Sequence, residues 1–355
     1  LHHWAYNRGK RSVILDLEHG HDRDQLRALA AGADVLIESF DPGVLDRWQL
    51  GYTQLGQANP ALIHVSITAF GSQGPKANWA ASDLIIQAAA GNLALTGDPD
   101  RAPLRAGGTM PQAYHNAASE AAGAALIALF ERQTRSGRGQ HIDISAQQSM
   151  NQAAQSLSLA TALSATPAAR VAGGVSLGAI PIQLRWPCAD GHVSVTFLFG
   201  QSFASFTHNL MAWVHEAGFC DQPTRDKNWV DYTAMLLDGR EPVAEYERVK
   251  QCLTAFFASK TKAELLEGAL ARRVLIAPVW TTAEVVASPQ LAHRGYWEEV
   301  DHGPAGCHRY PGAFAHFSAT PLPVLGPAPA LGAHTAEVLG EPPRLPATAA
   351  PPALA

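Results

Sequence analysis

Short apolar segments alternate with helical ones over the first 70 residues, and this alternation constrains the fold more than any other feature of the sequence. The expected strands span residues 12–17, 34–39 and 62–68, and the expected helices between them span residues 22–31 and 44–58. Asn59 and Pro60 end the second helix before the third strand. Strands that alternate with helices form βαβ units, so the sequence predicts an α/β fold with a Rossmann-like parallel sheet.

The rest of the chain predicts more of this large domain and then a smaller one. Helices are expected at residues 83–92, 112–132 and 147–163, and a strand is expected at residues 141–145. Ala189, Asp190 and Gly191 mark a hairpin turn, and helices are expected after it at residues 202–217, 242–259 and 262–272. We predict a large α/β domain at residues 1–174 and a small α+β domain at residues 175–285. A C-terminal segment at residues 286–340 returns to the large domain, and a Pro/Ala-rich tail follows at residues 341–355.

Composition narrows the function and the compartment. The 355 residues are 47% hydrophobic and 16% charged, with a formal net charge of −5, which argues against nucleic acid as the main partner. The four cysteines form no CxxC pair, and no apolar run is long enough to span a membrane, so we expect a cytoplasmic protein with reduced thiols. HExxH is absent and no Cys/His set has ligand spacing, so no metal is expected. The chain starts at Leu1, directly before a structured element, and we expect that a strand–helix unit precedes it.

The strand ends of the large domain carry the candidate binding residues. The turn before the first strand is basic, since Lys10 and Arg11 follow Asn7, and Phe40 follows the second strand. Arg47 lies on the helix that starts after Pro42 and Gly43. Helix N-termini favour anions, and strand carboxyl ends are the usual ligand edge of an open α/β sheet. These features suit a ligand that carries phosphates and a flat ring. Each also has a plain structural reading, as a solvated loop, a core aromatic or a water-facing helix residue.

The order of the motifs resembles that of the class III CoA-transferases, the CaiB/BaiF type, over nearly the whole chain. The segments that carry the resemblance are Asn7–Ser12, Ala33–Gly43, Val65–Gly71 with Gly74 and Pro75, Gly137–Asp143, Ser288–Gly295 and Leu331–Thr335. Each is weak alone, but together they stand in the family's order. The resemblance implies an interlocked homodimer. It also implies that acyl-CoA and a carboxylic acid are the substrates, with no permanently bound cofactor.

The resemblance also assigns roles to individual residues. It places the phosphates of CoA near Lys10, Arg11 and Arg47, and its adenine near Ser39, Phe40 and Trp48. Asn7 is a further residue of the CoA site by resemblance. Charge-assisted bonds from arginine or lysine to phosphate are strong. Gly173 and Gly174 resemble the glycine-rich loop that folds over the family's active centre.

The catalytic position departs from the family pattern. The aspartate that forms the covalent acyl intermediate in relatives falls on Gln112 or Tyr114 here, depending on the alignment, and neither is acidic. Asp83 matches a second acidic position of the family, and its structural reading is a helix N-terminal carboxylate. His115 is a further candidate base or nucleophile. Ser82 stands where the racemase relatives carry a histidine, so a two-base racemase is not expected.

Three functions remain open from the sequence. The first is transfer of CoA between an acyl-CoA thioester and a free carboxylic acid. The second is an acyl-CoA isomerase or intramolecular CoA transferase. The third is a CoA-binding protein that has lost transferase activity with the aspartate. The sequence does not identify the acyl group or the acceptor acid.

Overall fold

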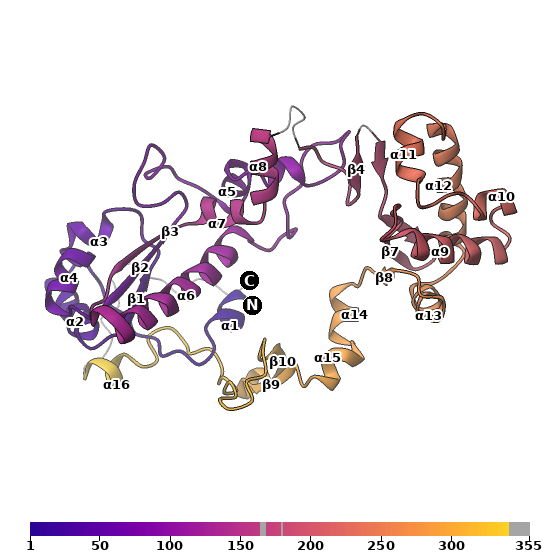
Figure 1. The fold of residues 1–355 in the computed structure, drawn as a ribbon. Helices are drawn as coiled ribbons and strands as arrows, with labels where there is room; N and C mark the ends of the chain where they lie inside the picture. The colour runs from indigo at the N-terminus through magenta and orange to yellow at the C-terminus, as the bar shows by residue number, and fades with distance from the viewer. Residues whose placement is uncertain (164–167, 179, 341–355) are drawn as a thin grey trace. The chain divides into compact units, whose positions relative to one another are not determined.

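The computed structural model describes residues 1–163, 168–178 and 180–340, and the chain divides into two compact units (Figure 1). The first unit comprises Leu1–Ile86, Pro111–Gln152 and the chain from Thr282 on. The second unit comprises Gln87–Met110 and Ala153–Thr281. The domain boundaries expected from the sequence stay a prediction.

A parallel sheet organises the first unit. Its strands β1 (Val35–Glu38), β2 (Ile63–Thr68) and β3 (His141–Ser145) lie in the order β1-β2-β3, and both pairings are parallel. The Rossmann-like parallel sheet predicted from the sequence is confirmed.

The two faces of this sheet differ in chemistry because side chains alternate along a strand. On one face Ile63 and Val65 pack against the alanine-rich helix α6 (Ala113–Glu131), which runs beside the sheet in Figure 1. The opposite face of β2 carries the buried polar residues His64, Ser66 and Thr68. A parallel sheet normally buries apolar residues on both faces, so the polar face calls for a functional explanation.

Residues 12–17 do not form the predicted strand. They run outside the sheet and bind the C-terminal segment of the same unit. Ser12 O accepts the His334 N–H at 2.9 Å, and the Ile14 N–H donates to Thr335 Oγ1 at 3.1 Å. Apolar alternation predicted an extended backbone, but only a neighbouring strand could have made it part of a ladder.

The helix predicted at residues 44–58 is two helices, α3 (Val44–Arg47) and α4 (Tyr52–Ala58). The break follows from the backbone between them, since Gln49 has a φ of 55°. A Cβ at Gly51 would lie 1.9 Å from Asp46 Oδ1, so only glycine fits there. The helix predicted at residues 147–163 is likewise divided, into α7 (Ala146–Gln152) and α8 (Gln155–Leu163).

The second unit is a smaller α+β structure. Strands β6 (Arg185–Cys188) and β7 (Gly191–Val195) form the predicted hairpin, and β8 (Ile276–Pro278) pairs antiparallel with β7. Helices α9 (Ala204–Glu216), α12 (Val243–Ala258) and α13 (Lys262–Arg272) agree with the sequence prediction within two residues. Its core is rich in aromatic side chains, among them Trp186, Phe197, Tyr246, Phe256 and Phe257.

The other α-helices and β-strands complete the two units. They are α1 (His2–Tyr6), α2 (Gly20–Ala31), α5 (Asp83–Ala89), β4 (Val175–Leu177), β5 (Ile180–Ile182), α10 (Gln222–Arg225), α11 (Tyr232–Leu237), α14 (Thr282–Val286), α15 (Pro289–His293), β9 (Trp297–Asp301), β10 (Cys307–Pro311) and α16 (Thr335–Leu339). Within the described residues, no helix combines the length and the apolar character that crossing a membrane requires.

Candidate active site

A cavity of about 430 Å³ opens where β1 and β2 end. We name it the strand-end cavity; its lining includes Ser39 to Pro42 after β1, Thr68 and Ala69 at the end of β2, Trp79, and Tyr114 from α6. Its volume lies within the range of small-molecule sites, and strand carboxyl ends are the usual ligand edge in α/β folds. The cavity is therefore the leading candidate for a ligand site in the first unit.

Aromatic rings dominate this cavity. Phe40 is 43% exposed and Trp79 is 59% exposed, which is high for such large apolar side chains. The Phe40 ring meets the Trp48 ring edge-on at 6.4 Å, and Lys76 Nζ lies 5.3 Å from the Trp79 ring. Exposed rings beside a cation suit a flat, negatively charged ligand.

Tyr114 lies in the first turn of α6. Burial raises its pKa, and the carboxylates of Asp41 and Asp83 raise it further, so the phenol stays protonated at neutral pH. A protonated phenol donates a hydrogen bond and is a poor nucleophile. Tyr114 is therefore suited to hold a carbonyl or carboxylate oxygen in the strand-end cavity.

Asp83 binds the N-terminus of the same helix. Its Oδ1 accepts the backbone N–H groups of Gln112 and Ala113, both at 2.7 Å, and its side chain is buried. A carboxylate at this position satisfies N–H groups that the helix itself leaves unpaired. The structure thus gives Asp83 a structural partner and places its charge near Tyr114.

The other catalytic candidates lie near these residues in the chain. Gln112 immediately precedes α6, and its backbone binds Asp83. The ring of His115 lies 4.9 Å from that of Tyr6, and its Nε2 is buried with no hydrogen-bond partner in the described part of the chain. Neither residue lines the strand-end cavity.

The basic turn makes contacts of its own. Lys10 Nζ donates to Asn7 Oδ1 at 3.0 Å, and Arg11 forms an exposed ion pair with Glu337 at 2.9 Å. Arg8 is buried, and it pairs with Glu298 at 2.6 Å and donates to the Leu325 carbonyl oxygen at 2.6 Å. It therefore links the basic turn to β9 and to the segment around Leu325. Lys10 and Arg11 remain exposed cations on this turn.

The adenine candidates are partly brought together. Phe40 and Trp48 are in ring contact, and Ser39 and Phe40 line the strand-end cavity. Arg47 is exposed at the end of α3. Within residues 1–163, 168–178 and 180–340, no hydrogen bond, ion pair or ring contact joins Lys10 to Phe40, Arg47 or Trp48. Their convergence on one ligand stays a prediction.

A second cavity, of about 310 Å³, lies on the polar face of the sheet and shares Asp41, Pro42 and Thr68 with the first. His64 lines it and is only 2% exposed, yet neither ring nitrogen has a hydrogen-bond partner among the described residues. Burial, and then the neighbouring His141, lower the pKa of His64 to about 4, so the ring is neutral at pH 7. An unpartnered buried imidazole is costly, which marks this cavity as part of the site.

Gly173 and Gly174 belong to the second unit. Gly173 has a φ of 74°, and a Cβ at Gly174 would lie 2.2 Å from Ile182 O, so the backbone needs glycine at both positions. Among the described residues, no three His, Cys, Asp or Glu side chains are grouped to hold a metal ion.

The family model for CoA-transferase family III matches residues 3–335. The chain belongs to this family. The subunit BbsE of succinyl-CoA:(R)-benzylsuccinate CoA-transferase from Thauera aromatica is 34% identical over 95% of this chain and 79% of the relative. Succinate–glutarate CoA-transferase from Agrobacterium fabrum is 30% identical over 98% of this chain and 82% of the relative. A CaiB/BaiF family protein from Brucella suis has a similar structure, with a TM-score of 0.79 and 28% identity over 95% of this chain and 83% of that chain.

For this member of CoA-transferase family III, sequence reasoning missed three residues of the site. Two of them are Lys76 and Trp79, which lie just after Gly74 and Pro75. The sequence analysis named Gly74 and Pro75 as part of a motif but did not consider the residues that follow them. The loop after the third predicted strand was the signal that could have found them. Asp41 lines both cavities, but its position directly before Pro42 suggested only a turn.

Proposed function

We propose that this protein transfers CoA between an acyl-CoA thioester and a free carboxylic acid. Membership of CoA-transferase family III over residues 3–335 carries this proposal, because it covers both units of the chain. The strand-end cavity supports it, since exposed aromatic rings and Lys76 suit a nucleotide thiol and Tyr114 suits an acyl oxygen. The relatives are named as transferases, so an isomerase or a binding protein without activity is not favoured.

The names of the relatives suggest the class of acid that this protein uses. Their names pair succinyl-CoA or succinate with benzylsuccinate and glutarate, and we infer that this chain also uses a dicarboxylic acid. We further propose a cytoplasmic homodimer in which Lys10, Arg11 and Arg47 bind the phosphates of CoA. Asn7, Ser39, Phe40 and Trp48 complete the CoA site, and Gly173 and Gly174 form a loop of the active centre.

Transfer of CoA between two acids can proceed through an acyl anhydride. A carboxylate attacks the thioester carbonyl, the C–S bond breaks, and CoA leaves as the thiolate while an anhydride forms. If the acceptor acid attacks, the thiolate then attacks the acceptor carbonyl of the anhydride, which forms the new thioester and releases the donor acid as its carboxylate. If a side chain attacks, the thiolate attacks the side-chain carbonyl, which forms an enzyme thioester and releases the donor acid. The acceptor carboxylate then displaces CoA to form a second anhydride, and the thiolate attacks its acceptor carbonyl, which forms the product and frees the side chain. The attacking carboxylate belongs to the acceptor acid or to a side chain, and Asp41 and Asp83 are the side-chain candidates near Tyr114.

The first experiment is an exchange assay on the intact assembly. Purified protein is incubated with succinyl-CoA and a ¹³C-labelled acid, and the thioesters are separated by mass spectrometry. We expect labelled acyl-CoA to appear and the acid of the donor to be released in equal amount. Retained binding of CoA without exchange for any of a broad set of acids would contradict the proposed function.

A second experiment locates the attacking carboxylate. Hydroxylamine converts an acyl-enzyme anhydride or thioester on an aspartate to a hydroxamate, which peptide mass spectrometry maps. An adduct on Asp41 or Asp83 would identify the side chain. Changing the labelled aspartate to Asn should then abolish transfer, while Asp100→Asn, an acidic control outside the strand-end cavity, should not. Full exchange with no adduct at any time point assigns the attack to the acceptor acid.

A further inference from the structure

The second unit contains a separate cavity of about 500 Å³ with a mixed lining. One side is apolar, with Pro99, Val171, Pro181 and Ile182, and the loop at Ala172 borders it. This volume and this apolar wall suit a small organic molecule with a hydrocarbon body.

The same cavity is strongly cationic. Its lining includes Arg170, Arg185 and Lys250 and contains neither aspartate nor glutamate. Solvent-exposed cations are usually interspersed with acids, so three cations around one apolar hollow form an electrostatic trap for anions.

Arg170 is fixed in place without being neutralised. Its guanidinium donates to the carbonyl oxygens of Ala94, Asp98 and Arg101, each at 3.1 Å. These acceptors carry no formal charge, and the Asp98 carboxylate is paired with Arg101. Arg170 therefore presents a full positive charge on a rigid support.

The remaining two cations differ from each other. Lys250 pairs with Glu247 at 3.0 Å. Arg185 is exposed at the start of β6, and its guanidinium has no hydrogen-bond or ion-pair partner among the described residues. Glu247 offsets the charge of Lys250, so the three cations keep an excess of two positive charges, on Arg170 and Arg185.

The glycine-rich loop shapes this wall. Ala172 and Gly173 both have positive φ values, 52° and 74°, and the Gly174 N–H donates to Val171 O at 2.9 Å. The close approach of Gly174 to Ile182 fastens the loop to β5. The cavity is thus built by a constrained backbone rather than by a mobile surface.

We propose that this cavity binds a small dicarboxylic acid, with its carboxylates on Arg170 and Arg185 and its hydrocarbon body against Val171 and Ile182. The excess of two positive charges matches the two carboxylates, and Arg presents a fork suited to each. That the ligand is a dicarboxylic acid, rather than another anion, rests on the proposed function.

Calorimetric titration of the full chain tests the proposal with three probes: succinate, butyrate and inorganic phosphate. We expect succinate to bind most tightly, and Arg185→Gln to weaken it about tenfold or more, which corresponds to about 1.4 kcal/mol. Arg240→Gln is the matched control, because Arg240 is an exposed arginine of the second unit outside this cavity. Hydrogen exchange should show that succinate protects the backbone of residues 169–172.

Unchanged succinate affinity in Arg185→Gln, butyrate as tight as succinate, or phosphate as tight as succinate would each overturn the proposal. The exchange assay with succinyl-CoA separates this result from the proposed function. Succinate binding that depends on Arg185, in a protein that exchanges no thioester, would leave the cavity assigned and remove the function. Thioester exchange in a protein that shows no Arg185-dependent succinate binding would support the proposed function and reject the assignment of this cavity.

Discussion

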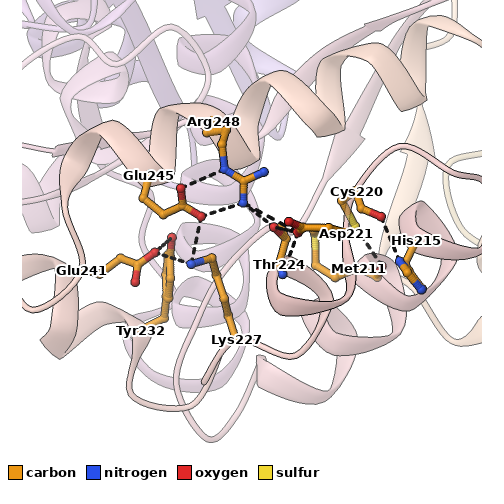
Figure 2. Close-up of polar contacts among 10 residues, drawn as sticks. All are labelled: Met211, His215, Cys220, Asp221, Thr224, Lys227, Tyr232, Glu241, Glu245 and Arg248. Atoms are coloured by element: carbon orange, nitrogen blue, oxygen red, sulfur yellow. Dashed lines mark hydrogen bonds and ion pairs between the residues drawn. The ribbon is translucent and has the colours of Figure 1, made fainter.

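Both units pair buried polar side chains, but the second unit joins several of them in one network. In Figure 2, Lys227 lies between Glu241 at 2.7 Å and Glu245 at 3.0 Å, and Arg248 binds Glu245 at 2.7 Å. The Tyr232 hydroxyl donates to Glu241 at 3.1 Å. Arg248, followed by Lys227, lowers the pKa of Glu245 to about 2, which is the signature of a closed ion-pair network.

The first unit has an ion pair of its own between Arg8 and Glu298, but other buried or exposed groups of this unit face its cavities. His64 has two unpartnered ring nitrogens, and Phe40 and Trp79 are exposed at the strand-end cavity. Its apolar packing is also divided between two clusters, one of which is the contact between β2 and α6. Paired polar groups hold a fold together, whereas unpaired ones are kept where a ligand completes them. The difference assigns stability to the second unit and chemistry to the first.

The largest expected effect is on the second unit's core. Phe256→Ala removes a fully buried ring and should lower the free energy of unfolding by about 3–5 kcal/mol. Phe40→Ala, at an exposed ring of the first unit, should change it by less than about 1 kcal/mol. Denaturant titration measures both values, and similar losses would remove the contrast between the units.

The ion-pair network should be nearly as sensitive. Lys227→Met leaves Glu241 and Glu245 without their shared cation, and we expect a loss of about 2–4 kcal/mol because both carboxylates are largely buried. Lys260→Met is the control, since no carboxylate pairs with Lys260 among the described ion pairs. Urea unfolding at pH 7 distinguishes them; an equal, small effect would show that the network adds little.

Acid should act on the first unit through His64. Its pKa is near 6.5 in the unfolded chain and about 4 in the folded protein, so between these values the unfolded chain binds a proton that the folded protein does not. Stability should therefore fall by about 2–3 kcal/mol as the pH drops from 6.5 to 4, and His64→Phe should remove that part of the loss. Unfolding curves across this pH range test the sign. A His64→Phe variant with the same acid sensitivity as the wild type would contradict a neutral buried imidazole.

The smallest effect is expected on ligand binding. Arg47→Ala should weaken CoA binding by about 1–2 kcal/mol through loss of a charged hydrogen bond, with no change in the midpoint of unfolding. Arg135→Ala provides an exposed arginine control on the same unit. Calorimetry with CoA gives the affinities, and equal values for both variants would place Arg47 outside the site.

The sequence predicted most of what depends on local pattern. The parallel sheet, the hairpin at residues 189–191 and the helices of the second unit follow from hydrophobic period and turn residues. Residues 12–17 were mispredicted because a ladder requires a neighbour that local pattern does not reveal. The break between Arg47 and Tyr52 was missed because the apolar pattern does not reveal the positive φ of Gln49. Phe40 was found from its place after a predicted strand and Tyr114 through the family resemblance, whereas Trp79, Asp41 and the buried His64 needed the fold to bring distant segments together.

The central claim is that acyl-CoA binds in the strand-end cavity of the first unit. The most direct test measures kcat/KM for CoA exchange by wild-type protein and by Phe40→Ala, at subsaturating succinyl-CoA and with the unfolding midpoint recorded in parallel. We predict a loss of about tenfold or more, equivalent to about 1.4 kcal/mol, at an unchanged midpoint. Wild-type rates in Phe40→Ala would place the bound acyl-CoA elsewhere and contradict this claim.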